Sequence, residues 1–171
     1  MATKSERGKK AGKSGRQSES LLDESDLTPA DDPAPSSDAT VLAHSRFAMT
    51  LLFVALAFGI VLETLHGFKA VTYLMDPVRK EFWSLAHFHG IGLALVNLVY
   101  SSWAGRTGLG VRNRSVSLSL MAGSVLLPLG FFLAGIAHYG SDPGLGIFLA
   151  PVGAALVLYA IGAIALTLWK R

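Results

Sequence analysis

The chain has 171 residues, of which 51% are hydrophobic and only 16% are charged, and it contains no cysteine. Soluble domains carry about 25% charged residues, so the composition excludes a single soluble globule. The lack of cysteine excludes disulfides, thiolate metal sites and a cysteine nucleophile.

Residues 1–45 form a polar segment with its charges in two blocks. Residues 1–16 hold six Lys or Arg, and residues 17–40 hold seven Asp or Glu with no Lys or Arg. Prolines at 29, 33 and 35 interrupt any helix there. With so little apolar surface to repay the entropy of ordering, we predict a disordered cytoplasmic tail over 1–45. No nucleic-acid partner is expected, because such charge blocks are usually solvated.

Four long apolar runs follow, at about 47–65, 82–105, 115–138 and 144–169. Each approaches or exceeds the ~20 residues that an α-helix needs to cross the hydrocarbon core of a bilayer. Backbone groups in lipid must be satisfied internally, and β-barrel strands would alternate and be about half as long. The sequence therefore predicts an all-α fold, a four-transmembrane-helix bundle over residues 46–171 with the lipid bilayer as its surroundings.

The charges between the spans predict the orientation of the bundle. An even number of spans places both termini and the 105–115 loop on one side of the membrane. Six basic residues flank the spans on that side: Arg46, Arg106, Arg112, Arg114, Lys170 and Arg171. The other side carries Lys69, Arg79 and Lys80. By the positive-inside rule, both termini are predicted in the cytoplasm and the protein in the bacterial cytoplasmic (inner) membrane.

Small residues recur every four positions in the third and fourth spans. They include Gly130 and Ala134 in the third, and Gly146, Ala150 and Ala154 in the fourth. This spacing lets helix backbones approach closely in lipid, where association depends on packing. Pro128 and Pro151 are each expected to kink or loosen their helix.

The second helix is expected to begin early and to carry two histidines on different faces. Asp76 followed by Pro77 is typical of an N-cap and first helical position. A stripe of small and polar residues then runs His87, Gly90, Ala94, Asn97 and Ser101. His89 lies about 200° from His87 around the helix and leads another stripe.

Ionisable residues at membrane depth are the first place to seek function, because their desolvation is costly. Four of them, Glu63, His66, His87 and His138, are predicted at the outer end of the bundle and are the candidate metal ligands. Imidazole and carboxylate would suit copper, zinc or iron, and imidazole could ligate haem, so the cofactor stays unknown. Alternatively, the cluster ties helices together by hydrogen bonds, which we favour, or handles protons or ions. Further polar candidates are His89, Asn97 and Lys69, while His44 stands apart on the cytoplasmic side.

Several short motifs resemble the YgdD-like family of small four-span membrane proteins. They are Leu65-His66-Gly67-Phe68-Lys69, Phe82-Trp83, the run 86–95, and the segments 121–124 and 151–154. The resemblance covers about residues 46–169 and implies that His66, Gly67, Lys69 and His89 occupy family positions. Glu63-Thr64, His87 and the charged tail depart from the family pattern. The resemblance implies the fold and assigns no biochemical activity.

Three hypotheses about function follow. The first is a non-enzymatic integral membrane protein that associates with itself or with a larger membrane complex. The second is a metal- or haem-binding redox or assembly module that uses the outer-face residues. The third is a small transporter, although the prolines of spans three and four have no counterpart in spans one and two.

Overall fold

The computed structural model describes residues 37–107 and 113–170. They belong to one compact unit, which spans Pro35–Arg171. The predictions for the tail over 1–36 and for Arg112 and Arg171 concern residues outside these ranges.

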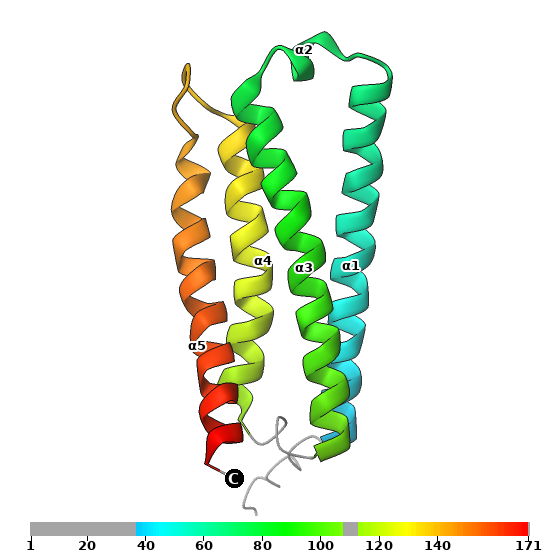
Figure 1. Ribbon diagram of the computed structural model, residues 1–171, viewed down its shortest axis with the longest axis vertical. Coiled ribbons are helices and arrows are strands. Elements are labelled where there is room, and N and C mark those ends of the chain that lie inside the picture. The colour runs from blue at the N-terminus through cyan, green and yellow to red at the C-terminus, as the bar shows by residue number, and fades with distance from the viewer. Residues whose placement is uncertain (1–36, 108–112, 171) are drawn as a thin grey trace, which may run out of the picture. The chain divides into compact units, whose positions relative to one another are not determined.

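The described chain is built from four long helices and two short connecting ones (Figure 1). The elements are α1 (Ser37–Gly67), α2 (Val71–Leu74), α3 (Pro77–Thr107), α4 (Arg114–Ile136), the 3-10 helix η3 (Leu145–Phe148) and α5 (Leu149–Trp169). Apart from one isolated bridge between Tyr139 and Asp142, residues 37–107 and 113–170 contain no β structure. The predicted all-α four-helix bundle is confirmed.

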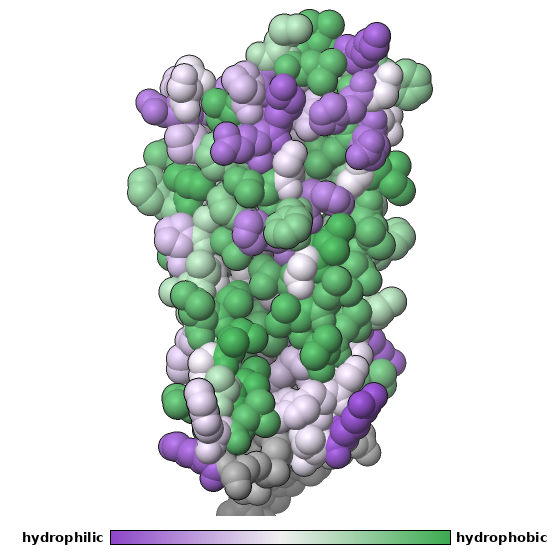
Figure 2. Space-filling view, viewed as in Figure 1, coloured by the Kyte–Doolittle hydropathy of each residue, from purple (hydrophilic) through white to green (hydrophobic). Residues whose placement is uncertain are grey.

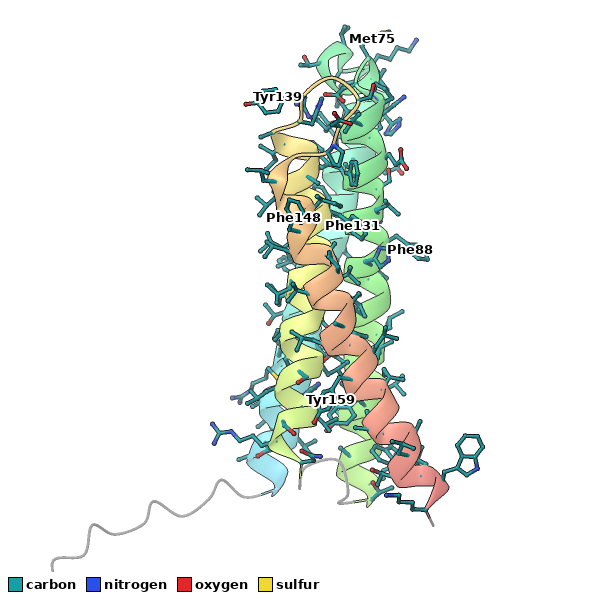
Figure 3. All side chains as sticks on the ribbon, turned by 90° about the vertical axis from the view of Figure 1, so that its left-hand side faces the viewer. Met75, Phe88, Phe131, Tyr139, Phe148 and Tyr159 are labelled. Atoms are coloured by element: carbon teal, nitrogen blue, oxygen red, sulfur yellow. The ribbon has the colours of Figure 1, made fainter. Side chains whose placement is uncertain are left out.

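All four long helices have the length and composition of membrane spans. At 1.5 Å per residue, the 31 residues of α1 or α3 extend about 46 Å, more than the ~30 Å hydrocarbon core. Figure 2 shows apolar residues across the middle of the visible face and hydrophilic residues at its two ends. Figure 3 shows Tyr139 and Met75 near one end and Tyr159 toward the other. The protein is therefore a multi-pass membrane protein in contact with lipid.

The helices pack in the order α1, α3, α4, α5. Extensive contacts join α1 to α3, α3 to α4 and α4 to α5, whereas α1 meets α4 only lightly. Only 17% of the most apolar stretch is buried in α1 and in α5, against 28% in α3 and 33% in α4. The outer helices α1 and α5 thus present most of their surface to lipid or to a partner.

The first helix begins earlier than predicted. It begins at Ser37, so the boundary expected between residues 45 and 46 falls inside α1. The prediction followed the charge count, but residues 39–45 are uncharged and the last proline of the tail is at position 35. Nothing in that stretch opposes a helix, and His44 becomes a buried residue of the bundle.

The other helix ends follow local chemistry. As predicted, α3 begins at Pro77 and the backbone N–H of Arg79 donates to Asp76 Oδ1 at 2.9 Å, which is an N-cap bond. The third span ends at Ile136, before the predicted 138, because Ala137 turns to extended backbone and Gly144 N–H donates to Ala134 O at 3.0 Å. Since α5 begins at Leu149, Pro151 lies in its first turn, where a missing N–H costs no helix bond.

Glycines bring α4 and α5 into backbone contact, and the contact of Gly130 with Ala150 joins two positions of the predicted small-residue pattern. A Cβ added at Gly123 would lie 2.7 Å from the carbonyl oxygen of Gly153, and one at Gly130 would lie 2.6 Å from the amide nitrogen of Ala150. A Cβ at Gly153 would collide with the backbone of Leu127. We call Gly123, Gly130 and Gly153 the glycine seam.

Candidate functional site

Two of the predicted site residues, Glu63 and His87, line one open groove between α1 and α3 with a volume of about 720 Å³. We call it the α1/α3 groove. His87 Nδ1 lies 2.9 Å from the backbone oxygen of Ala55 and donates to it, because a carbonyl can only accept. The imidazole fits against α1 because Gly59 has no side chain; a Cβ there would lie 3.0 Å from His87 Nδ1 and Nε2.

His66 and His89 are each anchored on their own helix. His66 Nδ1 donates to the carbonyl of Leu62 at 3.1 Å, and His89 Nδ1 donates to that of Leu85 at 2.8 Å. The His89 ring lies 5.0 Å from the ring of Phe131 on α4. Since His87 meets α1 and His89 meets α4, the prediction that they occupy different faces of α3 is confirmed. In Figure 2, hydrophilic residues also extend from one end into the apolar belt over α3.

His138 lies beyond the end of α4 and pairs with Asp76. His138 Nε2 donates to Asp76 Oδ2 at 2.8 Å. The guanidinium of Arg79 lies 3.5 Å from the same carboxylate oxygen, and Arg79 Nε donates to the carbonyl of Gly135 at 3.1 Å. These contacts join the start of α3 to the end of α4, and we call Asp76, Arg79 and His138 the α3–α4 clasp.

Burial raises the pKa of the Asp76 carboxyl, but hydrogen bonds from the Arg79 amide and His138, with the charges of those residues, outweigh it and leave the pKa below its ordinary value.

A lowered folded-state pKa stabilises the protein above the unfolded pKa, near 4, and this contribution disappears as the pH falls through the folded value. We expect the melting temperature in detergent to drop over this acidic range. Asp76→Asn, which keeps an N-cap residue, should remove that step, whereas Asp142→Asn on the exposed α4–α5 connection should retain it. An unchanged acid profile for Asp76→Asn would contradict the clasp.

The four predicted metal ligands are divided among separate contacts. Glu63 and His87 line the α1/α3 groove, His66 packs against Tyr73 with ring centroids 5.1 Å apart, and His138 belongs to the clasp. Among the residues that the structure describes, no three His, Asp or Glu side chains form a group that could hold a metal ion. Binding of haem, copper, zinc or iron by these residues stays a prediction. Lys69 is exposed in the α1–α2 connection, in left-handed backbone with φ of 52°.

The structure contains a buried polar network that the sequence did not predict. It lies toward the end of the bundle at which α1 and α4 begin. His44 is 3% exposed and Asn97 is fully buried. His44 Nε2 lies 2.7 Å from Asn97 Oδ1, and His44 Nδ1 lies 2.9 Å from the hydroxyl of Ser117. Asn97 Nδ2 donates to Ser124 Oγ at 2.7 Å. We call His44, Asn97, Ser117 and Ser124 the interior network, which joins α1, α3 and α4.

The proton positions in the interior network follow from its carbonyl acceptors. Asn97 Nδ2 also donates to the carbonyl of Leu93 at 2.7 Å, which fixes the orientation of the amide. Its Oδ1 therefore accepts, and His44 Nε2 carries the donated proton. In the neutral ring, His44 Nδ1 then accepts from Ser117. Every polar atom named here has a hydrogen-bond partner, so the network is suited to holding the three helices together.

One sequence signal could have revealed this network. Asn97 was placed correctly on the small, polar stripe of α3, where Gly90, Ala94 and Ser101 are also buried. A fully buried amide requires partners, and His44 follows an apolar run that extends the first span backwards. The pairing itself depends on the helix register, which the sequence does not specify.

Comparison of the chain with protein-family models, with curated proteins and with solved structures gives no match. Membership of the YgdD-like family stays a prediction that rests on the short motifs above.

Proposed function

We propose that the protein is a non-enzymatic membrane scaffold that associates with other membrane-spanning helices, of a second copy or of a larger complex, through α1. The observation that carries the proposal is the outer position of α1, which packs on α3, meets α4 lightly and leaves most of its apolar surface free.

An apolar groove between α1 and α4 offers the contact surface. It has a volume of about 300 Å³. Its lining includes Leu51, Val54 and Phe58 from α1 with Val125, Leu129 and Phe132 from α4. Val54 is 56% exposed, and Pro128 lies in the opposite wall. Because helices in lipid associate by packing, a recess between two spans favours insertion of side chains from a third.

The contacts inside the bundle favour a scaffold function because they hold the helices to each other. The interior network joins three helices, and the glycine seam joins α4 to α5. A transporter would have to break such contacts to alternate between states. A bundle whose helices are held together in this way is better suited to presenting a fixed surface to a partner.

We further propose the orientation given by the charges. Arg46, Arg106, Arg114 and Lys170 lie toward the end of the bundle at which α1 and α4 begin and α3 and α5 end, and this end is assigned to the cytoplasm of a bacterial cell. At the opposite end, Arg79 is held by Asp76, which lessens its weight as a topology signal.

The cysteine-free sequence allows a direct test of association. A single cysteine at Val54, modified with a photoreactive maleimide in native membranes, is expected to give covalent adducts at least about fivefold more efficiently than one at Leu158. Leu158 is the control because it is 72% exposed but lies on α5. The adduct identifies a second copy or another protein. Equal labelling at the two positions, together with particles of monomer size after extraction, would refute the proposal.

A further inference from the structure

The α1/α3 groove contains polar side chains, and all of them are available as hydrogen-bond acceptors. His87 donates its Nδ1 proton to Ala55, so the neutral ring has a lone pair on Nε2. That nitrogen has no hydrogen bond within residues 37–107 and 113–170, and it is not among the buried orphan atoms there. Thr64 Oγ1 donates to the carbonyl of Ile60 at 2.7 Å and retains only acceptor capacity toward the groove.

Glu63 gives the groove a negative charge. Its residue is exposed, and within the described chain it forms no salt bridge. A carboxylate near the end of a membrane span is costly unless it meets a cation or a hydrogen-bond donor. The Glu63 carboxylate, the His87 imine nitrogen and the Thr64 hydroxyl therefore select a cation that carries N–H groups.

The groove also has apolar walls, and these lie closer to the middle of the bundle than its polar groups do. They include Leu56 and Ile60 from α1 and Ile91 from α3. Glu63 precedes the end of α1 at Gly67 by about one turn, while Leu56 lies about two turns deeper. A ligand with its charged group beside Glu63 would extend an apolar chain along these walls. The volume of about 720 Å³ falls within the range of small-molecule sites.

We propose that the α1/α3 groove binds the primary ammonium group of an amphiphile that enters from the bilayer. The ammonium donates to Glu63, to His87 Nε2 and to Thr64, and the alkyl chain lies against Leu56, Ile60 and Ile91. The source is either an aminophospholipid headgroup or a free long-chain amine. Val54 does not line this groove, so the site does not depend on association there.

Binding of dodecylammonium to the full chain in phosphatidylcholine nanodiscs tests the proposal. Dodecyltrimethylammonium has the charge without N–H donors, and dodecanol lacks the charge. We expect each of these to bind at least about tenfold more weakly, since a charge-assisted hydrogen bond contributes about 1.5–3 kcal/mol and 1.4 kcal/mol is tenfold in affinity. Equal affinities for the three amphiphiles would overturn the proposal.

Substitutions locate the site and separate the two sources. Glu63→Gln, at an exposed position, should weaken dodecylammonium binding at least about tenfold, and Glu81→Gln, the exposed acidic control outside the groove, should leave it unchanged. Unaltered binding by the folded Glu63→Gln protein would overturn the assignment. The same binding measurement in phosphatidylethanolamine nanodiscs separates the two sources. Weaker dodecylammonium binding there, through competition by the lipid, assigns the groove to a lipid headgroup. Undiminished binding there assigns it to a free amine.

Discussion

Replacing Gly153 with leucine is expected to destabilise the bundle by about 3 kcal/mol, at the upper end of the usual cost of overpacking. The added side chain would meet the backbone of Leu127 rather than a side chain that could change rotamer. Helices α4 and α5 would therefore have to separate along the glycine seam. Unfolding of the purified protein in mixed micelles, followed by helical signal against the fraction of denaturing detergent, measures this loss.

Gly162→Leu is the matched control for this substitution. Gly162 lies on the same helix α5, and a Cβ added there would meet nothing within 4 Å. Leucine has the higher helix propensity, so Gly162→Leu should be neutral or slightly stabilising. Similar losses for Gly153→Leu and Gly162→Leu would mean that the α4–α5 contact contributes little to stability.

The helices and their packing faces could be predicted because membrane chemistry acts locally. Apolar length identifies a span, Asp76 before Pro77 identifies a start, and four-residue spacing identifies the Gly130 and Ala150 faces. These features depend on neighbours within one helix. Each was confirmed because no contact from elsewhere in the chain opposed it.

Tertiary contacts determined the features that the sequence did not predict. His138 was placed at the end of a span with the metal candidates, but it lies in the connection and binds Asp76, which had been identified only as a helix cap. His44 was set apart by a boundary drawn from charge, although its two ring nitrogens meet α3 and α4. Both pairings join residues more than 50 positions apart, and local patterns carry no information about them.

Trp83, at the start of the second apolar run, depends on tertiary contacts in the same way. In the structure its ring stacks on Phe132 with centroids 5.6 Å apart and its Nε1 donates to the carbonyl of Phe132 at 3.3 Å. A Cβ added at Gly135 would lie 2.7 Å from this ring. The tryptophan therefore packs between helices, and the small residue that admits it lies on another span.

The interior network should show strong coupling in a double-mutant cycle. Asn97→Leu leaves the buried Nε2–H of His44 without an acceptor, and His44→Phe leaves Asn97 Oδ1 without a donor. Each single substitution should therefore cost about 1–3 kcal/mol, the penalty of an unsatisfied buried polar group. The double variant removes both partners, so it should be less destabilised than the sum of the single losses by about 1–2 kcal/mol.

This coupling would exceed the average of about 0.6 kcal/mol measured for hydrogen bonds between membrane helices. The reason is that His44 and Asn97 are both buried, with His44 Nε2 2.7 Å from Asn97 Oδ1. Neither side chain can form a hydrogen bond with water instead when its partner is lost. Ser102→Ala supplies the control, because Ser102 is exposed and its hydroxyl donates only to the Leu98 carbonyl of its own helix. Combined with Asn97→Leu, it should give additive losses. If His44→Phe and Asn97→Leu were also additive, these side chains would act independently, and the register of α1 would have to depend on its apolar contacts alone.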